Sequence, residues 1–384
     1  MIAGERERQE THDLPAAAWV VALAGLSGMG PARLRAVLGR WQPQDAWRRV
    51  VEGRVHLEAE VVLAARRLDA ALSARWRQEA AATDVAGCWA THVDTGVGVV
   101  VRGDRAFPRA LQHDQEPPAV IFSLGSLEVL DRPRVAVVGT RRCTSAGRTT
   151  ARELGHDLAA AGVCVVSGLA QGIDGEAHRG ALEAERGAPP VGVVGTGLDV
   201  LYPRRNAELW VRVAAAGCMI SEYPLGTTPT AWRFPARNRI IAALADVVVV
   251  VESHAHGGSM HTVDAALERD RPVMVVPGPV RSPASAGTND LLAAGSAPVR
   301  DAGDVLAVLG LDAAVTGRGR VDRRPVPDPS AGAVLDALGW EPATIDTLAV
   351  RLGQSLGVVA VELSRLERDG WLSRQGGWFE RIGC

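Results

Sequence analysis

The feature that most constrains the fold is a repeated alternation between short runs of β-branched residues and alanine-rich stretches of helical length. The runs lack the alternation of polar and apolar residues that is seen in strands with one solvent-exposed face. The absence of this alternation is typical of strands buried on both sides. Helical stretches of about ten to fifteen residues separate most of them. The pattern therefore predicts an α/β protein with an extended Rossmann-like, doubly wound and mainly parallel sheet. The predicted strands are residues 98–101, 135–138, 163–167, 191–194, 219–221, 247–251 and 272–276.

The regions before and after this alternation have different sequence patterns. Residues 1–85 carry apolar residues at helical spacing and predict a small helical domain, followed by the Rossmann-like domain over residues 86–312. Residues 313–330 combine glycine, proline and arginine, as expected of a basic linker. Residues 331–384 show three helical stretches and then two strands about a Gly-Gly turn, the order of a winged helix.

Two of these flanking motifs leave their role open. The segment LSGMGPARL at residues 26–34 has two glycines in a turn and a proline at the start of the next helix, a helix-hairpin-helix (SAM-like) pattern. Gly28 and Gly30 would let backbone N–H groups approach a phosphate, or they form an ordinary helical turn. The presumed recognition helix, residues 357–369, has a face of mixed charge, so duplex binding and protein docking both stay open.

Local arginine clusters, rather than net charge, must account for any binding of nucleic acid. The formal net charge is only −2, and the chain contains no lysine, so all 42 basic residues are arginine. The missing amine excludes a Walker A loop, a Schiff-base enzyme and a kinase-type lysine. The scattered cysteines argue against a disulfide framework or thiolate zinc site, and no apolar run reaches about 18 residues. We expect a cytoplasmic protein without membrane association.

A phosphate site is expected where the strand at 135–138 runs into Gly139, Thr140 and Arg141. A buried strand followed by glycine and a helix N-terminus, here placed near Thr149, forms a backbone nest for anions at the carboxyl edge of the sheet. Arg141 and its neighbour Arg142 stand where the GxGxxG dinucleotide fingerprint needs small residues, so that fingerprint is absent. The alternative is that both arginines only solvate a surface loop.

The densest motif is SGLAQGID at residues 167–174, followed by His178. Gly168 and Gly172 bend the backbone at the same sheet edge, and Asp174 lies at a helix start, where it can cap N–H groups. Asp174 and His178 share a helix face at i and i+4, which suits an acid–base pair or a structural hydrogen bond. Because neither a nucleophile nor a metal site accompanies them, the structural hydrogen bond is favoured.

In order and spacing, these motifs and those that follow resemble the DNA-processing protein A (DprA, or Smf) family. The resemblance is strong over about residues 107–299. The further motifs are GTGLD at 195–199 with Tyr202, Pro203 and Asn206, SEYP at 221–224, FPARNRII at 234–241, Gly258-Ser259 with Thr262, Pro277-Gly278, and Gly287-Thr-Asn289.

The resemblance implies a homodimer that binds single-stranded DNA, protects it and helps to load the RecA recombinase during natural transformation or recombination. It implies no enzyme activity, cofactor or metal. Arg141 is implied as a groove arginine, with Trp232, Arg233, Phe234, Arg237 and Arg239 as a basic and aromatic wall. The full groove assignment is Gly139, Thr140, Arg141, Gly168, Gln171, Gly172, Trp232, Arg233, Phe234, Arg237, Asn238, Arg239, Gly258, Ser259, Thr262 and Asn289.

This chain departs from the family pattern at a few positions, and two other functions stay open. Thr140 replaces a serine but keeps the hydroxyl, Gln171 stands where a basic or aromatic residue is common, and the stretch at 254–261 holds three histidines without a recognisable acidic partner for a metal. A phosphoribohydrolase-like enzyme would need a PGGxGTxxE loop, which the stretch at 257–264 lacks. A nucleotide-sensing regulator with a winged-helix output is the other alternative.

Overall fold

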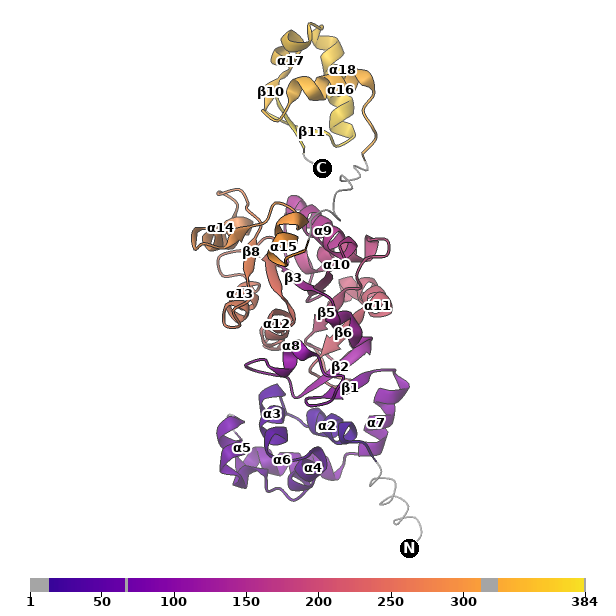
Figure 1. Ribbon diagram of the computed structural model, residues 1–384, viewed down its shortest axis with the longest axis vertical. Helices are drawn as coiled ribbons and strands as arrows, with labels where there is room; N and C mark the ends of the chain where they lie inside the picture. The colour runs from indigo at the N-terminus through magenta and orange to yellow at the C-terminus, as the bar shows by residue number, and fades with distance from the viewer. Residues whose placement is uncertain (1–13, 66–67, 312–323, 383–384) are drawn as a thin grey trace. The chain divides into compact units, whose positions relative to one another are not determined.

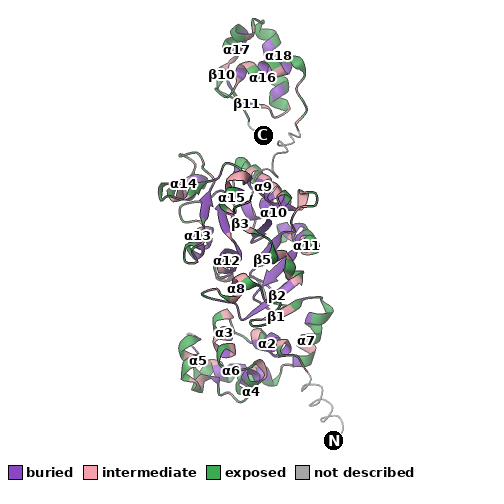
Figure 2. Cartoon of the chain, viewed as in Figure 1, coloured by how far each residue is buried: buried purple, intermediate pink, exposed green. Residues whose placement is uncertain are grey.

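The computed structural model describes residues 14–65, 68–311 and 324–382, and the chain divides into two compact units at residue 316. The first unit contains a nine-stranded sheet with helices packed around it, and the second is a small helical unit with its own three-stranded sheet (Figure 1). The inner strands of the large sheet are mostly buried, whereas its two edge strands are not and the surrounding helices expose their outer faces (Figure 2).

The first unit begins with a set of short helices whose starts follow local rules. Prolines occupy the first turn of α3 and α4, where a missing N–H costs nothing. Asp69 and Asp84 cap α6 and α7 by accepting hydrogen bonds from Leu72 N at 2.8 Å and Gly87 N at 3.0 Å. The helices are α2 (Ala16–Gly25), α3 (Pro31–Arg40), α4 (Pro43–Val51), α5 (Ala59–Ala64), α6 (Ala70–Ala81) and α7 (Val85–Asp94).

The large sheet has the order β1-β2-β6-β5-β4-β3-β7-β8-β9. In this order, every neighbouring pair of strands from β6 onwards is parallel. β1 and β2 add an antiparallel edge. Each predicted strand is present, but β2 and β9 were missed. The strands are β1 (Gly98–Val101), β2 (Val120–Gly125), β3 (Arg134–Val138), β4 (Cys164–Ser167), β5 (Val191–Val194), β6 (Cys218–Ser221), β7 (Val247–Val250), β8 (Val273–Val275) and β9 (Ala297–Pro298).

Both faces of the central strands are covered, which explains why these strands show no alternation of polar and apolar residues. Val135 and Val137 of β3 join a core with α9 (Ser145–Ala160), α10 (Ile173–Glu183) and α15 (Ala302–Val308). The intervening Ala136 and Val138 join a second core with α12 and α13 on the other face. The remaining helices of this unit are α8 (Arg109–Gln112), α11 (Ala207–Ala216), α12 (Arg233–Leu244), α13 (Met260–Leu267) and α14 (Ala286–Ala293).

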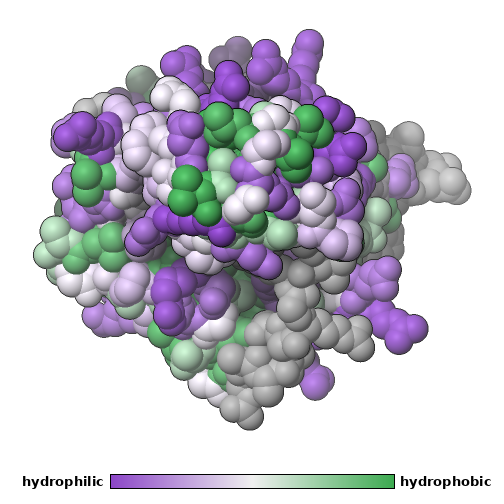
Figure 3. All heavy atoms as spheres, turned by 90° about the horizontal axis from the view of Figure 1, so that it is seen from above, coloured by the Kyte–Doolittle hydropathy of each residue, from purple (hydrophilic) through white to green (hydrophobic). Residues whose placement is uncertain are grey.

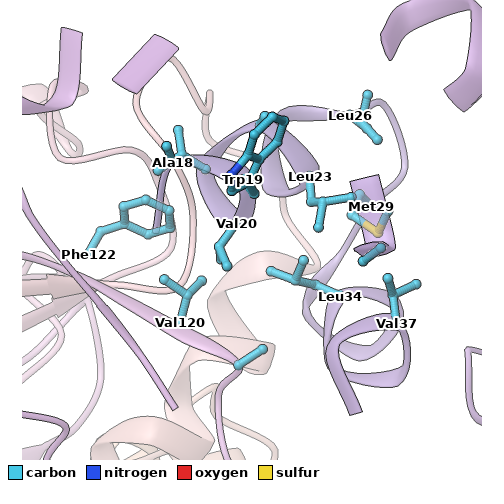
Figure 4. Close-up of a cluster of buried hydrophobic side chains, with 14 of the residues drawn as sticks. Ala18, Trp19, Val20, Leu23, Leu26, Met29, Leu34, Val37, Val120 and Phe122 are labelled. Carbon is cyan, nitrogen blue, oxygen red and sulfur yellow. The ribbon is translucent and has the colours of Figure 1, made fainter. Parts of the chain in front are cut away.

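The N-terminal helices share a hydrophobic core with the antiparallel edge of the sheet. Trp19 and Leu23 of α2 belong to the same buried cluster as Val120 and Phe122 of β2 (Figure 4). Residues 14–65 and 68–85 therefore pack onto the sheet within one unit. The separate helical domain stays a prediction.

The second unit has winged-helix order and a core of its own. Its sheet has the order β10-β12-β11, with both pairs antiparallel. Residues 313–323 of the predicted linker lie outside the described residues, and its last two residues, Pro329 and Ser330, belong to a helix. The elements are α16 (Pro329–Leu338), β10 (Ala343–Thr344), α17 (Ile345–Leu352), α18 (Leu356–Arg368), β11 (Leu372–Gln375) and β12 (Trp378–Arg381).

Candidate functional site

The candidate site lies at the carboxyl ends of the central parallel strands. From β3 the chain proceeds to β4 on one side, and it later returns to place β7 on the other side of β3. Ligands of open α/β sheets bind at such a reversal of strand order. Two adjoining cavities are found here and share five residues of their linings, namely Arg141, Ala170, Tyr202, Phe234 and Arg237.

The two cavities differ in size and in the strands that bound them. The inner cavity, of about 180 Å³, is also lined by Gly168, Gln171, Val194, Gly195, Thr196 and Pro203 at the ends of β4 and β5. The outer cavity, of about 900 Å³, extends past the ends of β3 and β7. Its further lining includes Gly139, Thr140, Arg142, Asp174, Asn238, His254, Gly258, Ser259 and Thr262.

The expected phosphate nest at the start of α9 is occupied by a carboxylate of the protein itself. The helix begins at Ser145 rather than near Thr149. Thr144 donates to Glu252 through its N–H (2.9 Å) and its hydroxyl (2.5 Å), and the N–H of Thr140 donates to the Glu252 carbonyl oxygen at 2.7 Å. Two backbone donors of the expected anion site, those of Thr140 and Thr144, are therefore used internally, and a phosphate site at this edge stays a prediction.

The predicted hydrogen bond between Asp174 and His178 is also wrong, although both side chains are buried structural elements. The Asp174 carboxylate turns back to the preceding loop and accepts a hydrogen bond from Gly168 N at 3.2 Å instead of capping its own helix. Burial raises the pKa of Asp174, and the nearby Arg237 opposes that shift. Burial lowers the pKa of His178 to about 4, so the imidazole is neutral at physiological pH.

Helix α12 brings three of the predicted residues to the cavities. Arg237 is 4% exposed, and its Nη1 donates to the carbonyl oxygens of Gly168, at 2.7 Å, and Val193. Asn238 Nδ2 donates to the Gly258 carbonyl oxygen at 3.3 Å. Phe234 lies with its ring 5.2 Å from that of Tyr202, centroid to centroid.

The guanidinium group of Arg141 lies over one ring of this aromatic pair. The guanidinium carbon of Arg141 lies 5.5 Å from the centroid of the Phe234 ring. Arg141 and Arg142 are exposed, and neither forms an ion pair with a carboxylate among the described residues. Unpaired guanidinium groups beside aromatic rings can bind phosphates and planar rings together.

Four of the predicted groove residues point elsewhere. Arg239 donates to the Glu222 carboxylate at 2.5 Å and to the Glu116 carbonyl oxygen at 2.6 Å. Trp232 and Arg233 lie outside both cavity linings, where the Arg233 guanidinium covers the rings of Trp232 and Tyr223. These three residues therefore lie outside the cavity linings, and their contact with DNA stays a prediction.

Asn289 is the fourth of these residues, and its role is structural. It receives a hydrogen bond from the N–H of Gly278 at 3.3 Å and donates to the carbonyl oxygen of the same residue at 3.1 Å. Gly172, by contrast, adopts a φ of +81° beside the backbone of Thr140 and Arg141, where a Cβ would collide. Gly172 thus shapes the loop behind the cavities.

Sequence reasoning missed several residues that line or build the site. Tyr202 and Asn206 were quoted within a motif but received no role. The Asn206 amide donates to the carbonyl oxygens of Leu169 and Ala170, both at 3.0 Å, and so fixes the loop between β4 and α10. Thr196 likewise lies in the quoted GTGLD motif without a role, whereas Glu252 gave no recognisable signal, since its position depends on strands that are distant in sequence.

Neither a metal centre nor a membrane-spanning helix is formed by the described residues. In residues 14–65, 68–311 and 324–382, no three His, Cys, Asp or Glu side chains gather closely enough to ligate a metal ion. His254 of the histidine-rich stretch instead lines the outer cavity. No helix of these residues has the length and hydropathy required of a membrane span.

The fold and site define a doubly wound α/β protein with a cationic and aromatic ligand cleft at its switch point, accompanied by a winged-helix unit. The chain belongs to the DprA/Smf family. Residues 98–310 match the family described as DNA recombination-mediator protein A, and residues 321–377 match the DprA winged helix domain.

Relatives and solved structures agree with this membership. Protein Smf of Escherichia coli is 35% identical over 72% of this chain and 75% of its own length, and DprA of Bacillus subtilis is 34% identical over 56% and 72%. The structure of Streptococcus pneumoniae DprA aligns with a TM-score of 0.62 at 28% identity, covering 77% of this chain and 98% of that one. DprA from Helicobacter pylori, whose structure concerns its single-stranded DNA binding mode, aligns at 0.50 with 30% identity, covering 56% and 95%.

Proposed function

We propose that this protein binds single-stranded DNA, protects it and helps to load the RecA recombinase during transformation or recombination. It acts in the cytoplasm as a homodimer and without a catalytic cycle. The observation that carries the proposal is the pair of cavities at the carboxyl edge, where the unpaired Arg141 and Arg142 adjoin the stacked Tyr202 and Phe234. The Helicobacter pylori relative, described by its single-stranded DNA binding mode, supports the same ligand.

The chemistry of the cavities favours an unpaired strand over a duplex. Arginine side chains neutralise phosphates of any sequence, and aromatic faces interact with any base that is not already paired. The inner cavity, at about 180 Å³ against about 900 Å³ for the outer one, is small, which suits a single ring rather than a base pair. Binding therefore requires exposed bases as well as phosphates.

The carboxylates near the cavities and the buried His178 have structural tasks, and the exposed His254 that lines the outer cavity has no ion pair with a carboxylate among the described residues, which favours binding over catalysis. The Glu252 carboxylate bonds Thr144, the Asp174 carboxylate bonds the loop at Gly168, and His178 is fully buried. A general acid or base must reach a proton of the substrate. We therefore infer that DNA is the ligand and not a substrate, in contrast to the phosphoribohydrolase-like alternative.

The direct test compares single-stranded and duplex oligonucleotides of equal length over a salt series. Single strands should bind at least about tenfold more tightly, and the affinity should fall steeply between about 50 and 200 mM salt. Arg212→Ala, which removes an exposed arginine outside both cavities, is the matched control and should bind as the wild type does. Equal affinity for both forms of DNA would contradict the proposal.

A further inference from the structure

A further groove lies at the amino ends of the central strands, the edge of the large sheet opposite to the two cavities. Arg134 begins β3, Asp246 directly precedes β7, and Arg271 stands two residues before β8. Together with residues 105–110 and 126–131, they line a groove of about 1090 Å³, which we call the amino-edge groove. Its lining shares no residue with either cavity. The groove is therefore separate from the candidate DNA site.

Three arginine side chains of the amino-edge groove have no counter-charge among the described residues. Arg105 and Arg109, before and at the start of α8, are exposed, and Arg271 is half-buried with its Nε buried and without a hydrogen-bond partner. Arg134, by contrast, is neutralised by Asp246 at 2.6 Å. Three unneutralised guanidinium groups around one groove repel one another and favour an anionic ligand.

The rest of the lining shows which kind of anion the groove suits. Phe107 and Leu130, each 4% exposed, contribute apolar surface. Glu128 and Asp131, on the 3-10 helix Leu127–Asp131, also line the groove, and neither forms an ion pair with an arginine of the described chain. A continuous chain of phosphates would be repelled by these carboxylates and would make no use of the apolar surface. A peptide can place carboxylates beside the arginines, apolar side chains against Phe107, and N–H groups toward Glu128 and Asp131.

We propose that the amino-edge groove docks an acidic peptide segment of a partner protein. The carboxylates of the segment pair with Arg105, Arg109 and Arg271, and its apolar side chains cover Phe107. This interaction goes beyond the proposed DNA binding and does not depend on it. Because the groove and the cavities lie at opposite edges of one sheet, the partner and a DNA strand can be bound at the same time.

The test uses a fluorescent peptide of repeating Asp-Asp-Leu units and a neutral version with Asn in place of Asp. Binding to the full chain is followed by fluorescence anisotropy. The groove variant carries Arg105→Ala and Arg109→Ala. The matched control carries Arg102→Ala and Arg212→Ala, which remove two exposed arginines outside the groove and change the net charge equally. All four side chains are exposed, so both variants should melt as the wild type does.

The groove variant should bind the acidic peptide about tenfold more weakly than the wild type, as expected for the loss of two arginine–carboxylate pairs. The control should stay within about twofold of the wild type, and the neutral peptide should bind the wild type at least about tenfold more weakly than the acidic one. Equal affinity of the wild type and the groove variant overturns the proposal. So does equal affinity for the two peptides, or the absence of binding at millimolar peptide.

Two further measurements distinguish other occupants of the groove. A saturating short single-stranded oligonucleotide should leave the peptide bound, and the groove variant should bind that oligonucleotide as the wild type does. Displacement of the peptide, or a loss of oligonucleotide affinity equal to that for the peptide, overturns the proposal in favour of nucleic acid. A smaller assembly for the groove variant than for the wild type, measured by sedimentation, overturns it in favour of a second copy of the chain.

Discussion

At the scale of single residues, the sequence located the centre of the site but not every member of it. Arg141 follows a predicted strand with only Gly139 and Thr140 between them, and it does line both cavities. Arg237 and Arg239 are two positions apart on α12, which places them on different faces of the helix. Arg237 therefore reaches the inner cavity, whereas Arg239 reaches Glu222. A motif alone does not distinguish these two faces.

The salt dependence of binding tests the role assigned to Arg141. Arg141→Ala removes an exposed cation that no carboxylate of the described chain neutralises. All single-stranded oligonucleotides should bind more weakly by a similar factor, and the slope of log K against log salt should fall by about one unit. The melting temperature should not change. An unaltered slope would show that Arg141 does not contact a phosphate.

Phe234→Ala should produce a different defect. The ring forms part of the wall beside Tyr202, so its loss removes an aromatic face worth about 1 to 3 kcal/mol per base and should leave the salt slope nearly unchanged. Because Phe234 is also packed on Tyr202, the melting temperature of the variant must be measured with its affinity. Early melting, with normal affinity at a temperature where the variant is folded, would refute the role in base stacking.

The buried His178 predicts a loss of stability in mild acid. Its pKa is lowered to about 4 in the folded protein by burial, so the unfolded chain binds the additional proton between about pH 6.5 and 4. Stability therefore falls as the pH falls through this window, by up to roughly 3 kcal/mol. The raised pKa of Asp174 acts in the opposite direction, at pH values above its ordinary range near 4.

Thermal melting from pH 7 to pH 4 measures this effect. His178→Gln removes the titrating group, so its melting temperature should decline less steeply with acid than that of the wild type. The absolute stability of the variant is irrelevant to this comparison, because only the slope against pH is used. Parallel slopes for the two proteins would rule out His178 as the source.

At the scale of elements, the periodicity of the sequence was sufficient to predict the central strands of the large sheet. It was insufficient to predict every strand near the edges of that sheet. β2 was missed because Val120–Gly125 follows two prolines and is separated from β3 only by a short 3-10 helix, Leu127–Asp131. β9 is only two residues long and carries no pattern. The start of α9 was placed too late because its N-cap, Thr144, bonds a glutamate more than one hundred residues away.

Helix α12 is anchored to the N-terminal helices on the side opposite to the cavities. Arg239 pairs with the buried Glu222, and Glu116 lies 3.9 Å from Arg239 and 3.8 Å from Arg35 of α3. In the turn before α3, the Ser27 N–H donates a hydrogen bond to the Glu79 carboxylate at 2.7 Å. This donor is taken within the protein, which favours a structural role for the predicted helix-hairpin-helix turn.

Arg239→Gln tests this arrangement. The substitution leaves Glu222 buried without its cation, a change that costs about 3 to 5 kcal/mol in comparable buried pairs. The melting temperature should therefore fall, while the salt slope of single-stranded DNA binding, measured below the melting range, should equal that of the wild type. A lower slope with unchanged stability would return Arg239 to the DNA groove.

At the scale of the whole molecule, both cavities are made by the first unit alone. Their linings fall between residues 138 and 262, and the winged-helix unit has a separate core. The exposed face of α18 carries the apolar Leu356, Val358 and Val361 besides Arg365 and Arg368. Figure 3 shows hydrophobic residues interspersed with hydrophilic ones on the face of the molecule seen there. The exposed face of α18, where apolar side chains lie among the arginines, is unlike the basic surface that neutralises duplex phosphates.

Removal of residues 317–384 should consequently leave binding of short single strands within about threefold of the full chain, a difference below ~0.7 kcal/mol. Calorimetry of the truncated protein confirms first that the remaining unit is folded. The preference for single strands over duplex should persist as well. A loss of affinity greater than tenfold would place part of the binding site in the winged helix.

The account depends most on where a bound strand lies, and hydrogen–deuterium exchange with and without a single-stranded oligonucleotide measures this directly. Protection should appear in residues 139–144, 168–172 and 229–238, which form the loops and the start of α12 around the two cavities. The wing at residues 372–381 should exchange equally in both states. Protection confined to the winged helix or to the hairpin at residues 26–34, with the cavity loops unchanged, would contradict the account.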